Sequence, residues 1–333
     1  MPKHYHAEPG ANSPPLISHE RNHIAGDTII GSSAQYVRVC LIGLLTLSAV
    51  SFPGSTSAQT DPPLTLKVIT SGEGSLYANF TLVMGEKDAV LVDAPFTRSD
   101  AHRLVADILE TGKDLKWIYV THDHPDHFFS MEVITLAFPN ARVISAPQVV
   151  ADIWASIPKK LNRWGPMLGA NGPRYPTAPE AYAEKYFELE GRKLEILGPM
   201  QGDHKNATAI YVPSLKALIA GDIVFHGVHV WLGETLEPQR KAWIDALDRL
   251  AALKPEIVVA GHKKPGLKDD PDAIRFTREY VETFNAAAKT AGTSEKLIET
   301  MRGKYPDVLD ALNDFILVGS AKVGVGETPP WEE

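Results

Sequence analysis

Three histidines and two aspartates crowd into residues 122–127, which read His-Asp-His-Pro-Asp-His. They directly follow the apolar run at residues 115–120. Imidazole nitrogens and carboxylate oxygens are the usual ligands of zinc and related ions. In an extended segment His122 and His124 point the same way, because side chains alternate. Asp126 and His127 would then lie on the first turn of a following helix and could face a second ion.

Three more residues of ligand type occur at other predicted strand ends. His204 lies in the loop Gln-Gly-Asp-His-Lys-Asn, Asp222 ends the run Ile-Ala-Gly-Asp, and His262 follows the run Val-Val-Ala-Gly. A catalytic zinc ion needs about three protein ligands and an open position. Two ions need roughly twice as many, with one group bridging them. A lone histidine at a strand end is more often a polar turn residue, but this combination favours a metal site.

The positions match, in order and spacing, the motif set of the metallo-β-lactamase-fold hydrolases, and the chain resembles that superfamily over about residues 64–266. The resemblance implies an α/β fold, the αββα sandwich, with the site at one edge between two β-sheets. It implies two Zn²⁺ ions, although other divalent transition metals would also suit these ligands. The implied first-metal ligands are His122, His124 and His204, the second-metal ligands are Asp126, His127 and His262, and Asp222 bridges both ions.

Two further roles follow from the resemblance. Asp93, which closes the run Ala-Val-Leu-Val-Asp, matches the family's aspartate that supports the metal ligands from behind. Asp126 is also the expected catalytic residue. The implied activity is that of a zinc-dependent hydrolase, in which a metal-bridging hydroxide cleaves a lactone, ester, thioester, amide or phosphoester bond of a small molecule.

Differences between this sequence and the motifs of individual branches of the superfamily narrow the range of expected activities. True β-lactamases of this fold usually lack an aspartate at the bridging place, where one subclass has cysteine, so Asp222 favours the other hydrolase branches. Glyoxalase II-like enzymes continue the first motif with two glycines, whereas this chain continues with Phe128 and Phe129. A β-lactamase-like amide hydrolase remains an alternative.

Two other classes of function also stay open. An iron-dependent oxidoreductase of the persulfide type would use a single metal, so that His127 and His262 would not serve as metal ligands. The diiron type would carry glutamate in place of His124. A non-catalytic zinc protein is a third class, but structural zinc sites are usually closed and rich in cysteine. Cys40 is the only cysteine of this chain.

The elements that must position these residues alternate between strands and helices, which favours a layered α/β domain. We expect a catalytic domain at residues 62–270 and a helical C-terminal extension at 271–333 packed on the same domain. Residues 162–179 are rich in glycine and proline and read as a long loop, which we expect to form a substrate wall. The candidate substrate-lining residues are Phe128, Trp164, Tyr175, His226, His229 and Trp231.

The N-terminus predicts export. Residues 39–50 form an apolar run of about a dozen residues, too short for a membrane span, and Ala58 fits a signal-peptidase site. We therefore expect a polar, disordered extension at residues 1–37, a signal peptide at 38–58, and a periplasmic or secreted mature protein without stable membrane insertion. The formal net charge of −8 does not indicate a surface that binds nucleic acid. A small-molecule substrate is the expected partner, and the oligomeric state stays open.

Overall fold

The computed structural model describes residues 63–332, which belong to one compact unit. The predicted disordered extension and signal peptide lie outside the described residues. None of the helices among residues 63–332 combines the length and apolar character that a membrane span requires. The domain boundary expected near residue 270 stays a prediction.

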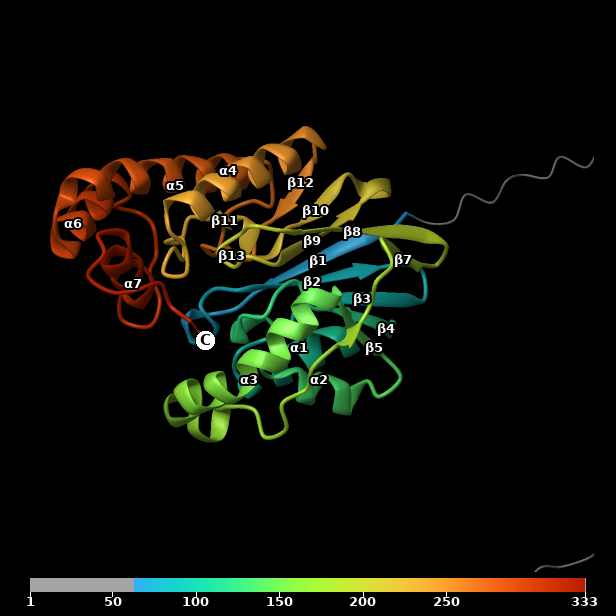
Figure 1. Ribbon diagram of the computed structural model, residues 1–333. Helices are drawn as coiled ribbons and strands as arrows, with labels where there is room; N and C mark the ends of the chain where they lie inside the picture. The colour runs from blue at the N-terminus through green and yellow to red at the C-terminus, as the bar shows by residue number, and fades with distance from the viewer. Residues whose placement is uncertain (1–62, 333) are drawn as a thin grey trace, which may run out of the picture. The chain divides into compact units, whose positions relative to one another are not determined.

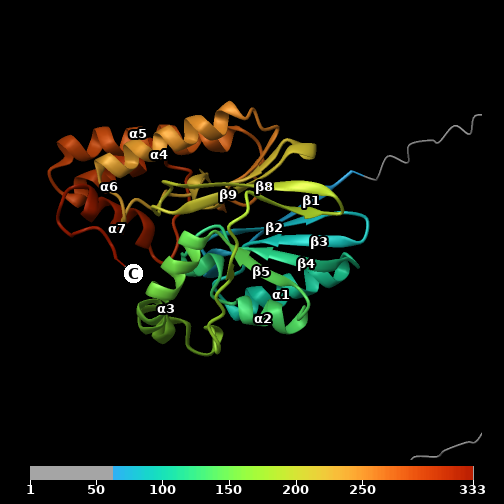
Figure 2. The ribbon, with the colours of Figure 1, turned by 45° about the vertical axis from the view of Figure 1, so that its right-hand side comes forward.

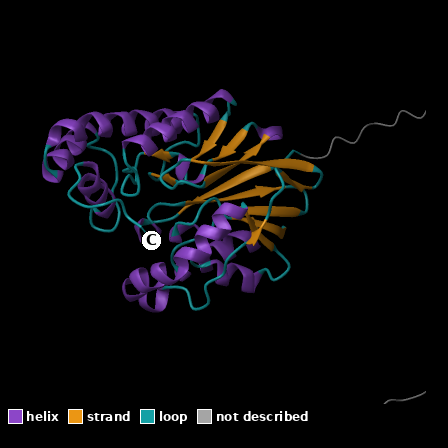
Figure 3. Ribbon diagram, in the orientation of Figure 1, coloured by secondary structure: helices purple, strands orange, loops and turns teal. Residues whose placement is uncertain are grey.

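Two β-sheets form the centre of the unit, and helices cover both outer faces (Figures 1 and 3). The first sheet has the strand order β1-β2-β3-β4-β5-β6, in which β3 to β6 run parallel. Its strands are β1 (Thr65–Thr70), β2 (Asn79–Met84), β3 (Asp88–Val92), β4 (Asp114–Tyr119), β5 (Arg142–Ser145) and β6 (Glu180–Ala181).

The second sheet has the order β12-β10-β9-β8-β7, and its strands β10 and β12 are parallel. A separate two-stranded pair, β11 and β13, lies near the end of β12 (Figure 1). The strands are β7 (Tyr186–Leu189), β8 (Arg192–Met200), β9 (Ala207–Val212), β10 (Ala217–Ile219), β11 (Phe225–His226), β12 (Ile257–Val259) and β13 (His262–Lys263).

The first three helices cover the first sheet, and α4 and α5 cover the second (Figures 1 and 2). This is the αββα sandwich expected from the sequence. The helices are α1 (Arg98–Glu110), α2 (Met131–Ala137), α3 (Pro147–Leu168), α4 (Glu237–Ala252), α5 (Asp272–Ala291), α6 (Ser294–Lys304) and α7 (Phe315–Gly324).

Three apolar cores correspond to these layers. Val90, Tyr119 and Ile210 belong to the core between the two sheets. Alternate residues of the same strands face outward: Leu91 and Ile118 pack under α1, α2 and α3. Burial on both faces explains the continuous apolar run at residues 89–92 of β3 and the apolar end of β4 at residues 117–119.

The C-terminal helices share the core of the second layer. Trp243 of α4, Phe284 of α5, Met301 of α6 and Leu317 of α7 all belong to one buried cluster. The expected C-terminal extension is largely helical, with a break between α6 and α7, because α7 begins only at Phe315. Residues 312–314 adopt left-handed backbone angles, with φ between 53° and 66°, which a continuous helix does not permit.

The prediction of a loop at residues 162–179 is wrong for its first part, because α3 continues to Leu168. Pro158 and Pro166 lie inside this helix, where proline is normally unfavourable. Trp164 explains why the helix persists: its ring is buried edge-on against Phe96 and Phe315, at centroid distances of 5.4 and 5.7 Å. Tertiary packing of this ring outweighs the unfavourable local propensity.

A short turn also replaces the helix start expected at residue 125. Pro125–His127 form one turn of 3₁₀-helix, and α2 begins only at Met131. The backbone N–H of Ala94 donates to the carbonyl of His127 at 2.8 Å, which ties this turn to the end of β3.

Glu190 joins the β7–β8 turn of the second sheet to the β2–β3 turn of the first sheet. Both turns lie at the end of the sheets opposite the histidine cluster. The carboxylate of Glu190 accepts hydrogen bonds of 2.7–2.8 Å from the backbone N–H groups of Glu86, Lys87 and Asp88, between β2 and β3. The bonds from Lys87, Asp88 and Glu86 lower the pKa of Glu190 to about 2. An unfolded glutamate titrates near pH 4.3, roughly. This stabilisation is therefore present above that pH and is lost as the pH falls towards 2.

Glu190→Gln should consequently lower the melting temperature at pH 7, and the difference from the parent protein should shrink as the pH falls from about 5 to about 2. Thermal denaturation across this pH series measures the effect. Glu188→Gln, at an exposed position on β7, is the matched control. A difference that stays constant with pH would contradict the proposed role of the Glu190 carboxylate.

Trp164→Ala should lower the free energy of unfolding by about 3 kcal/mol, because it removes a buried aromatic ring. Trp154→Ala alters the same helix at a side chain that is 64% exposed, and should change stability by less than about 0.5 kcal/mol. Urea denaturation of the two variants checks this. Equal losses would show that Trp164 does not hold α3 on the domain.

Candidate metal centre

The histidine cluster forms where the carboxyl ends of two pairs of parallel strands meet. Asp93 and His122 follow the neighbouring strands β3 and β4, and Asp222 and His262 follow β10 and β12. Gly261 makes the approach of the second pair possible, since a Cβ there would lie 2.0 Å from Asp222 Oδ1. The two sheets therefore bring side chains from four distant parts of the chain into one site.

Two groups of buried side chains have the composition and spacing of metal sites. In each group every residue offers one ligand atom within 4.8 Å of the others. The first group consists of His122, His124, Asp203 and Asp222, and the second consists of Asp126, His127 and His262.

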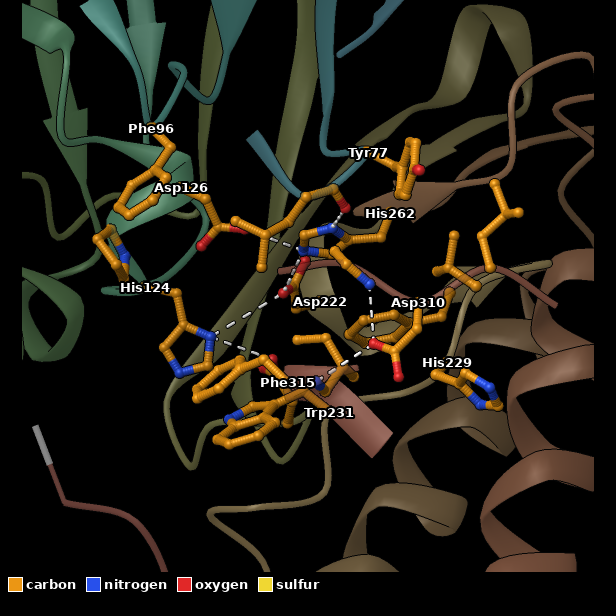
Figure 4. A pocket seen from close by; sticks show the side chains of 18 of the residues that line it. Tyr77, Phe96, His124, Asp126, Asp222, His229, Trp231, His262, Asp310 and Phe315 are labelled. Atoms are coloured by element: carbon orange, nitrogen blue, oxygen red, sulfur yellow. Dashed lines mark hydrogen bonds and ion pairs between the residues drawn. The ribbon is translucent and has the colours of Figure 1, made fainter. Parts of the chain in front are cut away.

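Asp222 lies between the two groups. Its Oδ1 is 3.1 Å from His127 Nε2, and its Oδ2 is 3.0 Å from His262 Nε2 and 3.5 Å from His122 Nε2. Figure 4 shows its carboxylate between His124 and His262. Asp126 Oδ2 completes the second group, 3.3 Å from His262 Nε2 and 3.8 Å from His127 Nε2.

Asp93 orients two of the histidines from behind. Its Oδ2 accepts a hydrogen bond from His127 Nδ1 at 2.8 Å and another from the hydroxyl of Thr121, also at 2.8 Å. That hydroxyl in turn accepts from His122 Nδ1 at 3.0 Å, since its own proton points at Asp93. Both histidines thus carry a proton on Nδ1 and direct Nε2 into the cluster.

The other two histidines of the groups are also oriented by a hydrogen bond from one ring nitrogen, which leaves the other nitrogen facing the cluster. His262 Nδ1 donates to the carbonyl of Leu76 at 2.7 Å, which leaves Nε2 facing Asp222. His124 is reversed: its Nε2 donates to Glu234 at 2.8 Å, and its Nδ1 faces Asp203 at 3.1 Å. The neutral form of each ring therefore turns a lone pair towards a carboxylate, an arrangement that is stable only with a proton or another cation between them.

The pKa shifts follow from the same crowding. Burial lowers the pKa of His122 to about 4. Burial alone would raise the pKa of Asp222, but His127, His262 and His122 together hold it well below its usual range. Burial likewise opposes the charged form of His124, yet Asp203 and Glu234 raise its pKa well above the usual value.

Several of these atoms lack a hydrogen-bond partner although they are buried. Among the described residues, they include His122 Nε2, Asp222 Oδ1 and both carboxylate oxygens of Asp203. Unpaired buried polar atoms are costly and rare in native proteins. Nitrogen and oxygen donors without sulfur, close together and converging, fit zinc or a similar divalent ion.

His204 is the one predicted ligand that lies outside both groups. Its Nδ1 is 3.2 Å from Asp123 Oδ1, and its ring centroid is 5.8 Å from that of His124. Asp203 Oδ2 lies nearer, 3.1 Å from His124 Nδ1. Asp123 also pairs with Lys160, a fully buried side chain of α3, at 2.8 Å. Burial opposes the charged form of Asp123, but Lys160, His204 and His124 hold its pKa well below the usual range.

Four residues around the cluster have no role predicted from the sequence: Asp203, Glu234, Asp123 and Lys160. Asp203 and Asp123 each adjoin a predicted ligand in the sequence, which was a usable signal. Glu234 and Lys160 stand in segments without any motif, and only the fold brings them to His124 and Asp123.

A pocket opens onto the cluster. Of the six candidate lining residues, Trp164, His229 and Trp231 line it. Phe128 is buried in the core under the first sheet, and Tyr175 is 72% exposed. His226 packs against Phe276 of α5 at a ring distance of 6.0 Å. None of these last three is among the described residues that line the pocket.

The sequence profile of the Metallo-beta-lactamase superfamily matches residues 74–262 of this chain, the segment that contains every residue of the two groups. The chain belongs to the metallo-β-lactamase superfamily. Membership agrees with the resemblance noted in the sequence and with the layered fold.

Individual members of the superfamily are distant relatives of this chain. It is 23% identical over 227 residues to a metallo-beta-lactamase type 2 from Pseudomonas aeruginosa, covering 67% of this chain and 81% of that protein. A metallo-beta-lactamase family protein from Thermus thermophilus shares its fold, with a TM-score of 0.57 and 22% identity over 79% of this chain and 92% of the other. A metallo-beta-lactamase from Pontibacter korlensis has a TM-score of 0.48 and 21% identity, covering 66% and 94%.

Lys160→Met should destabilise this superfamily member by about 3 kcal/mol, because removal of one partner leaves the Asp123 carboxylate buried with less compensation. Lys159→Met, at the exposed neighbouring position of α3, should change stability by less than about 0.5 kcal/mol. Urea denaturation of both variants at pH 7 measures the difference. If Lys160→Met proved as stable as Lys159→Met, the buried pair would not hold α3 against the metal centre.

Proposed function

We propose that this protein is a hydrolase that holds two divalent metal ions, with zinc as the first choice, and cleaves an ester, lactone, thioester, amide or phosphoester bond of a small molecule. The position of Asp222 between the two groups carries the proposal. Its two oxygens lie 3.0–3.5 Å from histidine nitrogens of both groups, which suits a carboxylate shared by two ions.

The residues would divide into two ligand sets. His122, His124 and Asp222 would hold one ion, with His204 or Asp203 as the further ligand. Asp126, His127, His262 and Asp222 would hold the other. When bound, the ions would supply Lewis-acid polarisation of the substrate oxygen and a nucleophile at neutral pH.

The protein's own residues would contribute orientation, proton handling and exclusion of water. Asp93, Thr121 and the Leu76 carbonyl hold three imidazoles with Nε2 inward, so little reorganisation is needed. Asp126 lies in the second group and also lines the pocket. We assign to its carboxylate the role of accepting the proton released during attack and passing it to the leaving group.

A β-lactamase activity is the second candidate. It is favoured by the similarity to the Pseudomonas aeruginosa protein named metallo-beta-lactamase type 2. A panel of lactones, esters, thioesters, phosphotriesters and β-lactams, assayed with zinc, distinguishes the two candidates. Turnover of β-lactams alone would favour the second, and turnover of the others would favour the first.

Metal content tests the ligand sets directly. Protein purified without added metal should contain two zinc ions per chain, and a chelator should remove both zinc and turnover. Asp222→Ala should lower metal content and reduce hydrolysis by more than about a hundredfold, because even residues behind the ligands typically contribute 10–100-fold, roughly. His102→Ala, at an exposed position of α1, is the control.

Parallel analysis of His204→Ala and Asp203→Asn decides which of these neighbours serves the first ion. Loss of about one zinc per chain in only one of them identifies the ligand. Full metal content and full turnover in Asp222→Ala would disprove the dinuclear site. A single iron per chain in the parent protein would instead support the oxidoreductase alternative.

A further inference from the structure

Residues beyond the segment that matches the superfamily contribute to the wall of the pocket beside the histidine cluster. The match ends at residue 262. Leu309, Phe315 and Trp331 all line the pocket. Leu309 lies between α6 and α7, Phe315 begins α7, and Trp331 lies in the tail that follows α7. This part of the site is therefore a property of this chain's C-terminal extension.

Aromatic rings make up much of that wall. Phe315, at the first turn of α7, stacks on Trp231 at 5.2 Å and 16°, and meets Trp331 edge-on at 5.5 Å. Its other side contacts Trp164 of α3 at 5.7 Å. Figure 4 shows Phe315 and Trp231 side by side below Asp222 and next to His124. One aromatic surface thus extends from the metal centre to the C-terminal tail.

Away from the histidine cluster, the described residues that line the pocket carry no cationic side chain, since none of them is lysine or arginine. The nearest cation is Arg163, whose guanidinium lies 3.5 Å from the centroid of the Trp331 ring and which lines a neighbouring pocket. His229, at the far end from His124 in Figure 4, is neutral near pH 7, because burial lowers its pKa to about 4. Its Nδ1 is already bonded to the hydroxyl of Tyr280 at 2.7 Å.

The charged groups at the pocket wall are instead carboxylates. Besides the cluster residues, Glu234 and Asp310 line it. Asp310 is held in place by the backbone N–H groups of Ala311, Ile316 and Leu317, at 2.8, 3.3 and 3.2 Å. An anionic group that entered this end of the pocket would meet apolar rings and like charge, and burial of an unpaired charge is strongly unfavourable.

We propose that the C-terminal wall selects substrates whose arm is neutral and apolar, an aryl group or a medium-length alkyl chain, and rejects arms that end in a carboxylate. This inference rests on the proposed function, since it assigns the substrate class of the same site. The scissile bond lies at the metal centre, and the apolar arm lies against Trp231, Phe315 and Trp331.

Hydroxamates with different arms test the inference by binding rather than by turnover, because the hydroxamate head binds zinc and the arm must occupy the pocket. Three probes are titrated calorimetrically into zinc-loaded protein: acetohydroxamate, octanohydroxamate, and the eight-carbon monohydroxamate whose chain ends in a carboxylate. Octanohydroxamate should bind about tenfold or more tightly than its carboxylate analogue, since only the neutral chain gains from apolar burial.

Substitutions in the pocket wall test where the arm of the probe binds. Phe315→Ala and Trp331→Ala should each weaken octanohydroxamate about fivefold or more by removing apolar contact area, and should leave acetohydroxamate unchanged within about twofold. Trp331 is only partly buried, so its variant keeps the test valid if Phe315→Ala fails to fold. Trp154→Ala, on the exposed face of α3, should alter none of the three affinities.

The outcomes distinguish failure of this inference from failure of the proposed function. If the protein binds zinc and acetohydroxamate, but octanohydroxamate and the carboxylate analogue bind equally, the inference is overturned and the proposed function stands. Tighter binding of the carboxylate analogue overturns the inference as well. If the protein binds no zinc, or binds zinc without binding any hydroxamate, the proposed function fails and the inference falls with it.

Discussion

Four carboxylates, those of Asp93, Asp126, Asp203 and Asp222, are buried within one site beside four imidazoles. Such a concentration of acidic groups away from water is unfavourable unless each is paired. Asp93 is paired entirely by protein donors, through Thr121 and His127. The others face nitrogen lone pairs, so the cluster needs protons or metal ions for its own stability. The surrounding architecture can be understood as the support that this arrangement requires.

That support is geometric before it is chemical. Parallel strands in each sheet end at the same edge, and the two sheets face each other across a common apolar core. Small residues let the loops approach: Gly221, with φ of +50°, and Gly261 both lie where a Cβ would collide with the site. The positions of Asp222 and His262 depend on those two glycines as much as on the strands that precede them.

The C-terminal helices contribute both to the core and to the pocket. They complete the core over the second sheet, with Phe284 and Leu317 buried beside Trp243. The C-terminal extension also directs Phe315 and Trp331 to the pocket. Under the proposal above, a wall of apolar rings anchored in the core would disfavour substrates that it cannot pair.

Local patterns in the sequence by themselves predicted most of the strands and helices and a layered α/β domain, since alternation and apolar runs report on neighbours in the chain. The αββα sandwich and the seven ligands followed from the resemblance to the superfamily, and the structure gathers six of these seven residues into two groups. Asp93 was also recognisable, because it ends an apolar strand at the motif position. Only the tertiary structure placed Asp203 beside His124 and His204 beside Asp123. It also decided the contacts of Glu234 and Lys160 and the helical state of residues 162–168. Each of these depends on contacts between segments distant in the sequence, whose packing energies exceed the local propensities that a sequence pattern reflects.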